Sequence, residues 1–344
     1  MSDKIPPLIS TVSSAFIADW LVALRALCAP DHYASLLKRS HLEYDATTPQ
    51  SRVNLDQIVS LYQLAAVETG DEMMGLWSRP IRPRALQHLL TSVREATSLT
   101  SALYRFSTFW NLLLDDYQFE LVELAAERRF ALRLVAQGDD PVQRFGHMLI
   151  LKLAHGLLSW LARAEVAVAG VEFAFARPDF DDDYALIFPA PLTFDCPQTA
   201  ILFDADVLGP VQVRSSADLD RFLENAPRDW IFTKSQQHTQ SLRVRAYLAQ
   251  VGWEEAHLRH AADALHMTPR TLIRKLEAQG TSFQAIKDGL RRDIAIRQLQ
   301  VGEVSIEAIA QDVGFASAAS FHKAFLRWTG TTPSTYRRSN QIAR

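Results

Sequence analysis

An internal repeat in the last hundred residues constrains the fold more than any other feature of the sequence. Four apolar residues spaced i, i+3, i+4 and i+7 recur 48 positions later: Leu258, Ala261, Ala262 and Leu265, then Ile306, Ile309, Ala310 and Val313. After a short break, Leu272 and Leu276 recur 49 positions later as Phe321 and Phe325. The extra residue falls in the break, where a turn can absorb it. Each copy is therefore predicted to be a helix-turn-helix, two short helices joined by a tight turn.

The second helix of each copy is the one that enters the major groove in helix-turn-helix proteins. Thr268, which precedes Pro269, and Ser317 are predicted to cap these helices. With the apolar residues buried, the residues left outside are Arg270, Thr271, Ile273, Arg274 and Lys275 in the first copy, and Ala319, Ser320, His322 and Lys323 in the second. The repeat offset aligns Arg270 with Ala319, Ile273 with His322, and Arg274 with Lys323.

These residue types suit the reading of base edges. The planar fork of arginine reaches guanine O6 and N7 together, and lysine or histidine can donate to the same edges. Ile273 can make only apolar contact, for instance with a thymine methyl group. At least half of protein–DNA hydrogen bonds go to the backbone, so some of these cations will contact phosphate. The DNA-binding residues that we predict are Thr268, Arg270, Thr271, Ile273, Arg274, Lys275, Ser317, Ala319, Ser320, His322, Lys323 and Arg327.

A longer helix is predicted between the two copies. Phe283, Ile286, Leu290 and Ile294 give its apolar face, and Thr281 or Ser282 would cap it. Such a helix would hold the two units at a fixed separation, so that their second helices enter major-groove segments about 34 Å apart. Six further arginines could contact the DNA backbone or lie on the surface, and the sequence does not separate these alternatives: Arg291, Arg292, Arg297, Arg327, Arg337 and Arg338.

Charge is distributed unevenly. From Ser241 to Arg344 there are 15 Lys+Arg and 9 Asp+Glu, a net charge of +6, whereas residues 1–240 carry −9. A small basic region behind a large acidic one indicates a polyanion-binding module joined to another domain, although chance variation is the alternative. No run approaches the ~18 apolar residues of a membrane span, and the start of the chain lacks the pattern of a signal peptide. With only Cys28 and Cys196, we expect a cytoplasmic protein with reduced cysteines.

Residues 1 to about 230 are predicted to be α+β, with helices first and a small antiparallel sheet later. Helical apolar spacing around Trp20, Val59, Leu89 and Leu103 gives way to alternation at Phe130, Leu132 and Leu134, in the second strand of a predicted hairpin. Asp140-Pro141 is predicted to start a long apolar helix. Further short strands are predicted at 171–175, 185–188, 192–194 and 200–203. The predicted organisation is an effector-sensing or dimerisation domain over 1–232, a linker over 233–241 and an all-α DNA-binding domain over 242–338.

An aromatic-rich stretch in the first domain could form the wall of a pocket. The predicted effector-binding residues are Tyr104, Phe106, Trp110 and Arg128; an ordinary core and a solvated hairpin end are the alternatives. Asp181-Asp182-Asp183 could bind a divalent cation, but a solvated loop is the favoured interpretation. The three histidines His257, His260 and His266 have no Cys or carboxylate partners arranged for zinc. We find no Walker loop, GxGxxG or GxSxG motif. We therefore predict no catalytic residue, no metal, no cofactor and no enzymatic activity.

The C-terminal region resembles the DNA-binding domain of AraC/XylS-type transcriptional regulators over about residues 242–338. The most specific matches are GTSF at 280–283, IAQDVGF at 309–315, FHKAFLRW at 321–328 and TPSTYR at 332–337. The resemblance implies seven helices with two helix-turn-helix units. It also implies base contacts from Arg270, Ile273, Arg274, His322 and Lys323. Leu326 departs from the family, where a lysine is common, and puts one phosphate contact in doubt.

Residues 20–215 are similar to the arabinose-binding-type N-terminal domain of the subgroup of ornithine-utilisation regulators. The similarity rests on a proline- and aromatic-rich stretch from Ala176 to Gln212. The opening helices do not fit the cupin sensor of AraC itself, so arabinose is not implied. We expect a homodimeric, effector-controlled activator that binds double-stranded promoter DNA, contacts RNA polymerase and does not associate with membranes. The alternative is a regulator whose first domain serves only oligomerisation or protein interaction.

Overall fold

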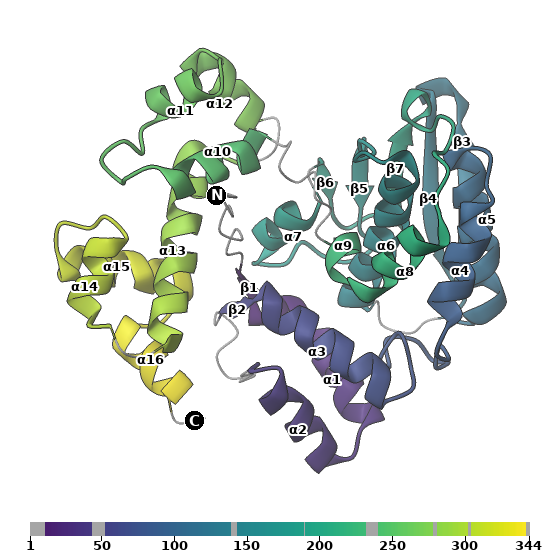
Figure 1. The fold of residues 1–344 in the computed structure, drawn as a ribbon, viewed down its shortest axis with the longest axis horizontal. Helices are drawn as coiled ribbons and strands as arrows, with labels where there is room; N and C mark the ends of the chain where they lie inside the picture. Colours follow the sequence, from purple (N-terminus) through teal and green to yellow (C-terminus); the bar gives the residue numbers. More distant parts are fainter. Residues whose placement is uncertain are drawn as a thin grey trace. The chain divides into compact units, whose positions relative to one another are not determined.

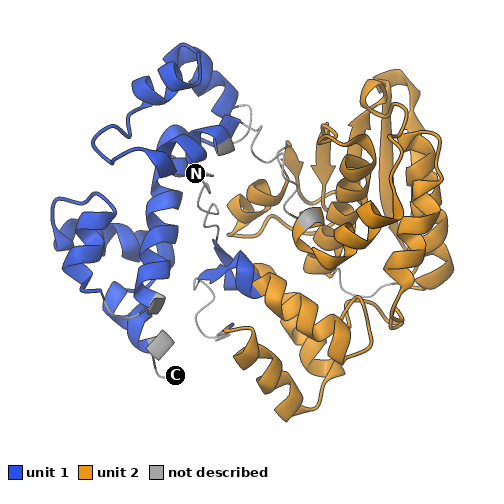
Figure 2. Cartoon of the chain, viewed as in Figure 1, with its two compact units in different colours: residues 1–15, 42–57, 237–344 blue, residues 16–41, 58–236 orange. Residues whose placement is uncertain are grey.

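The structure is a computed structural model that describes residues 11–42, 52–138, 143–188, 190–231, 240–277, 281–301 and 304–341. The chain divides into two compact units (Figure 2). Unit 1 consists of residues 1–15, 42–57 and 237–344, and unit 2 of residues 16–41 and 58–236. Unit 1 thus combines the basic C-terminal region with two short segments from the first sixth of the sequence. The predicted linker lies outside the described residues, except for Gln240 and Ser241, which begin a helix.

Unit 2 contains a five-stranded sheet with helices packed on it (Figure 1). The strands are β3 (Tyr117–Leu124), β4 (Arg129–Ala136), β5 (Gly170–Glu172), β6 (Leu192–Thr193) and β7 (Thr199–Asp204). Their order is β3-β4-β7-β5-β6, and every neighbouring pair is antiparallel except β5 with β6. The helices are α1 (Ala18–Leu27), α2 (Pro30–Arg39), α3 (Leu55–Glu68, whose first turn counts with unit 1), α4 (Ala85–Arg94), α5 (Leu99–Leu113), α6 (Arg144–Ala162), α7 (Asp181–Ile187), α8 (Ser216–Glu224) and α9 (Arg228–Ile231).

The α+β class predicted for this region is confirmed, and so is the hairpin of β3 and β4. Arg128 closes the hairpin turn in the left-handed region, with φ of 53°. The strand predicted at 185–188 is wrong, because Ala185 lies within α7. Three aspartates fill the first turn of α7, where negative charge is stabilised by the helix dipole. Residues 139–142 lie outside the described residues, so the predicted cap at Asp140 has no described structure.

Helix α6 forms the centre of unit 2. Its length and apolar composition would suffice to cross a membrane, but 89% of that window is buried within the fold. At its first turn, Arg144 makes a bidentate ion pair with Asp19 of α1, with N–O distances of 2.8 and 2.7 Å. Next to this pair, Phe145 stacks on Trp20 with ring centroids 4.9 Å apart. The amphipathic helix α1 is thereby fixed to the start of the core helix.

Three titratable side chains of α6 are buried among apolar residues. Burial lowers the pKa of His147 to about 3, and burial together with the neighbouring Lys152 charge lowers the pKa of His155 to about 3. His155 bridges the Lys152 ammonium, at 3.1 Å from Nδ1, and the Val166 carbonyl, to which Nε2 donates at 2.8 Å. Burial lowers the pKa of Lys152 to about 8. Both histidines are therefore neutral in the folded protein at neutral pH.

Unit 1 holds a two-stranded sheet and seven helices among its described residues. They are β1 (Thr11–Ser13), β2 (Arg52–Asn54), α10 (Gln240–Gln250), α11 (Leu258–Ala264), α12 (Pro269–Glu277), α13 (Phe283–Val301), α14 (Ile306–Asp312), α15 (Ala318–Thr329) and α16 (Pro333–Gln341). The seven helices and their all-α region are as predicted. β1 and β2 were not predicted, since three-residue strands carry no readable alternation.

Acidification should destabilise unit 2 through its buried histidines. An unfolded histidine binds a proton near pH 6.5, whereas His147 and His155 do so only near pH 3, so their contribution to stability is present above pH 6.5 and is lost as pH falls toward 3. Between pH 7 and pH 5 we expect the free energy of unfolding to fall by about 2 kcal/mol for each histidine. Urea titrations at both pH values measure the change. The variant His147→Gln should show about half of this fall in the free energy of unfolding, and the exposed control His88→Gln should show all of it. An equal fall in the wild type and both variants would contradict a contribution from His147.

Candidate nucleic-acid interface

The two predicted helix-turn-helix units are present and have equivalent turns. In the first, α11 and α12 are joined through His266, which has a φ of 54°. In the second, α14 and α15 are joined through Gly314, with φ of 74°. These two residues are 48 positions apart, so the repeat extends to the one backbone position in each turn that adopts the left-handed conformation. Glycine adopts it without strain, whereas histidine does so at a cost.

The two second helices begin at equivalent caps. The Thr268 hydroxyl accepts a hydrogen bond from the Thr271 N–H at 3.2 Å, and the Ser317 hydroxyl accepts one from the Ser320 N–H at 3.2 Å. In both caps the paired hydroxyl groups also contact each other, at 2.9 and 3.0 Å. Four of the predicted DNA-contacting residues therefore also fix the first turn of the two helices.

The predicted outward faces of α12 and α15 are accessible. Leu272, Leu276, Phe321 and Phe325 are at most 1% exposed, which fixes the rotation of both helices. The exposed residues are Thr268, Arg270, Ile273, Arg274 and Lys275 at α12, and Ser317, Ala319, Ser320, Lys323 and Arg327 at α15. Thr271 and His322 are half-buried. The two helices thus present a similar basic and polar surface.

The arginines that the sequence left unassigned have different surroundings. Arg327 pairs with Asp288 of α13, with an N–O distance of 3.1 Å. Arg291 is half-buried, with its guanidinium carbon 4.9 Å from the ring centroids of both Trp253 and Phe315, and it donates to the Gly314 carbonyl at 3.1 Å. Desolvation lowers the pKa of Arg291. Arg291 therefore supports the second turn from the inside rather than lying free on the surface.

Helix α13 joins two separate hydrophobic cores. Its first half contributes Ile286 and Leu290 to the core of α10–α12, and its second half contributes Ala295, Ile296 and Leu299 to the core of α14–α16. Ile294 packs against both. The helix starts after Ser282, whose hydroxyl accepts from the Ala285 N–H at 3.1 Å, which confirms one of the two predicted caps. A continuous helix of 19 residues therefore sets the spacing between the two helix-turn-helix units.

The predicted effector residues lie in different surroundings. Phe106 and Trp110 of α5 are 2% and 0% exposed, with ring centroids 6.1 Å apart in an edge-to-face arrangement. Tyr104, on the same helix, is 65% exposed. Arg128 lies at the tip of the β3–β4 hairpin, where it pairs with Asp206 at 3.0 Å. Among the described residues, no cluster of three or more His, Cys, Asp or Glu side chains could hold a metal ion.

Two equivalent helix-turn-helix units with accessible basic faces define a DNA-binding protein. Comparison with protein families gives the same result. The profile described as the arabinose-binding domain of AraC transcription regulators, N-terminal, matches residues 32–209, and a helix-turn-helix domain profile matches residues 261–339. The chain belongs to the AraC family of transcription regulators.

The chain is similar to curated family members. It is 25% identical over 293 residues to the ornithine utilization regulator of Pseudomonas aeruginosa, a match that covers 84% of this chain and 86% of that protein. It is 32% identical over 132 residues to the RCS-specific transcriptional activator RclR of Escherichia coli, covering 36% of this chain and 46% of that one. Among solved structures, the transcriptional regulator CdpR from P. aeruginosa aligns with 94% of this chain and 98% of its own, at 19% identity and a TM-score of 0.33.

Substitution of Gly314 should disrupt the second helix-turn-helix. A Cβ atom at this position would lie 2.5 Å from Cγ of Trp253, and the positive φ adds strain. We expect Gly314→Ala to lower the free energy of unfolding by about 1–3 kcal/mol. Gly289→Ala in α13 is the matched control: its Cβ would meet nothing closer than 3.6 Å, so the variant should gain about 0.5–1 kcal/mol. Equal stability of the two variants in urea titrations would contradict this account.

Proposed function

We propose that this chain is a transcription activator that recognises a promoter with α12 and α15 and responds to a small molecule bound by unit 2. The observation that carries the first part is the repeated surface: two helices with equivalent caps and basic outward faces, joined by one continuous helix. Two such helices can enter successive segments of the major groove. The names of RclR and of the urease operon transcriptional activator of Escherichia coli, which is 30% identical over 107 residues, favour activation.

Arg274 and Lys323 are the central residues of the proposed contact. They occupy equivalent positions in the repeat, are exposed, and have no ion-pair partner among the described residues. Both are therefore available to donate to guanine or to phosphate. Arg327 differs, because its pair with Asp288 directs it along α13. We assign Arg327 to the DNA backbone or to the support of α15.

The proposed effector site lies in the buried part of unit 2, where α5 and α6 pack against each other. Trp110 Nε1, Trp77 Nε1 and His147 Nε2 are buried and have no hydrogen-bond partner among the described residues. The rings of Trp77 and Tyr117 are 5.7 Å apart, and those of Tyr117 and His147 are 4.7 Å apart. Buried polar groups without partners cost free energy, so a ligand that accepts hydrogen bonds from the two indole N–H groups would be stabilised here. The name of the ornithine utilization regulator suggests an amino acid.

We propose that the active form is a cytoplasmic homodimer that also contacts RNA polymerase at the promoter. Each monomer would cover two major-groove segments, so a dimer would occupy two such sites. The effector would act by changing how the two DNA-binding regions are presented, which requires different affinities for the two states. The domain division predicted from the sequence gives sensing to the first domain and DNA recognition to the second.

Replacement of Arg274 by alanine tests base recognition. Genomic fragments selected with the purified protein and then footprinted give the site. We expect Arg274→Ala to weaken binding to this site by about 1–3 kcal/mol and to relax selectivity at one base pair. Arg259→Ala in α11 removes the same charge from an exposed position outside the second helix. It should weaken binding about equally on all sequences, and the same uniform loss for Arg274→Ala would restrict that residue to phosphate contact.

Thermal melting with named probes tests the effector site. L-ornithine should raise the stability of the chain by about 2.7 kcal/mol at 100 times its dissociation constant. L-lysine, one methylene longer, and L-arabinose serve as controls. The stabilisation by L-ornithine should be lost in Trp110→Phe, which keeps an aromatic ring but removes the indole N–H. No shift with any probe would favour the alternative, in which unit 2 is an oligomerisation or interaction module.

A further inference from the structure

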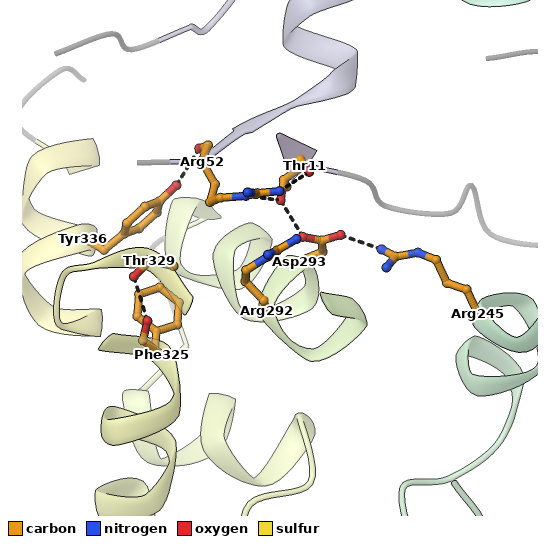
Figure 3. A network of polar contacts seen from close by, with 8 residues as sticks. All are labelled: Thr11, Arg52, Arg245, Arg292, Asp293, Phe325, Thr329 and Tyr336. Carbon is orange, nitrogen blue, oxygen red and sulfur yellow. Dashed lines mark hydrogen bonds and ion pairs between the residues drawn. The ribbon is translucent and has the colours of Figure 1, made fainter. Parts of the chain in front are cut away.

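The short β1–β2 pair cannot be stable on its own. Each strand has three residues, paired in the register Thr11–Asn54, Val12–Val53 and Ser13–Arg52. An isolated two-stranded pair is at best marginal even when longer. Val12 and Val53 are nevertheless 0% and 3% exposed. Hydrogen bonds also join the pair to other parts of unit 1, as the close-up in Figure 3 shows.

The central contact is the buried carboxylate of Asp293, in the middle of α13. The Thr11 hydroxyl of β1 donates to Oδ1 at 2.5 Å, and Arg245 of α10 donates to Oδ2 at 2.5 Å (Figure 3). Arg292 lies 3.4 Å from Oδ1. Thr11, Arg245 and Asp293 are all at most 5% exposed, so these bonds are shielded from water. A buried carboxylate is stable only with such partners.

A second contact holds the other strand. The Tyr336 hydroxyl of α16 donates to the backbone carbonyl of Arg52 at 2.9 Å, and Arg52 in turn donates to the Thr11 hydroxyl from Nε and to the Thr11 carbonyl from Nη2. The strand pair is thus bonded to α13 in the middle of that helix and to α16 in the second core. α13 contributes to the cores of both helix-turn-helix units, and α16 contributes to the core of the second.

The chain continues from both strands directly into helices of unit 2. β1 is followed without a break by a short 3-10 helix (Ser14–Ile17) and α1, and β2 is followed without a break by α3. The two strands are therefore joined covalently to α1 and α3 and by hydrogen bonds to α13 and α16. Any change in the course of α1 or α3 would first move β1 or β2.

We propose that the β1–β2 pair is a clasp that fixes α13 and thereby the spacing of the two recognition helices. This inference rests on the proposed reading of two DNA segments. The positioning residues are Thr11 and Tyr336, whose hydroxyl groups bind the clasp to α13 and α16. Removing these two hydroxyl groups should make the spacing between the two helix-turn-helix units less fixed. It leaves the residues that face DNA unchanged.

The test measures how strictly the protein requires the spacing of its two DNA segments. One base pair inserted between the segments rotates one of them by about 34°. We expect the wild-type chain to lose about tenfold or more in affinity on the inserted site. The double variant Thr11→Val/Tyr336→Phe removes two hydroxyl groups with little change of shape. Its affinity for the inserted site should be less than about threefold below its affinity for the original site.

Thr329→Val is the matched control. Thr329 is as buried as Thr11 and belongs to the same unit, but its hydroxyl donates to the Phe325 carbonyl of its own helix (Figure 3). This variant should keep the wild-type spacing requirement. A general loss of stability would weaken binding to both sites and leave their ratio unchanged, so the ratio isolates the clasp. A double variant that discriminates as strongly as the wild type overturns the proposal.

Hydrogen exchange of the full chain without DNA gives a second measurement. The double variant should exchange faster in peptides that cover the middle of α13, and Thr329→Val should not. Unchanged protection there would overturn the clasp independently of DNA binding. A wild-type chain that enriches no genomic site would instead contradict the proposed function, and hydrogen exchange would still decide whether the clasp holds α13.

Discussion

Both helix-turn-helix units depend on α13, because each half of this helix completes a different hydrophobic core. Ile286 and Leu290 belong to the first core, and Ile296 and Leu299 to the second. If the helix ended near its middle, the second core would lose Ala295, Ile296 and Leu299. The same continuity makes the separation of α12 and α15 a property of a helix, which rises by a constant amount per residue and is stiffer than a loop. DNA, with its fixed helical repeat, is a ligand for which such a fixed separation is useful.

Asp293 introduces a charge where that helix passes between its two cores. Its burial would be unfavourable alone, since an unpaired buried carboxylate loses its hydration. Arg245 supplies the opposite charge and Thr11 a hydrogen bond, so the carboxylate needs one partner from α10 and one from β1. Removing one partner of a buried pair typically costs about 3–5 kcal/mol. The two hydrogen bonds therefore connect α13 to α10 and to β1 at one buried position.

In unit 2, a buried helix carries titratable side chains. α6 is buried along nearly its whole length, and yet it carries Lys152, His147 and His155. The two histidines tolerate burial by staying neutral, and His155 uses both ring nitrogens, one toward Lys152 and one toward the Val166 carbonyl. His147 has a partner on one ring nitrogen, the hydroxyl of Thr199, at 2.8 Å.

The sequence by itself determined the two helix-turn-helix units, their caps and their outward faces, because these depend on apolar spacing and capping residues within about 50 positions. It also indicated the β3–β4 hairpin, where alternation runs through Phe130, Leu132 and Leu134. Segment 185–188 was misassigned, since a short apolar run fits a strand or a helix until its packing is known. Only the tertiary structure decided that Thr11 joins Asp293, 282 positions away, and that Arg52 joins Tyr336. Three-residue strands have no period, and a lone aspartate does not reveal whether its neighbours in space will be water, arginine or threonine.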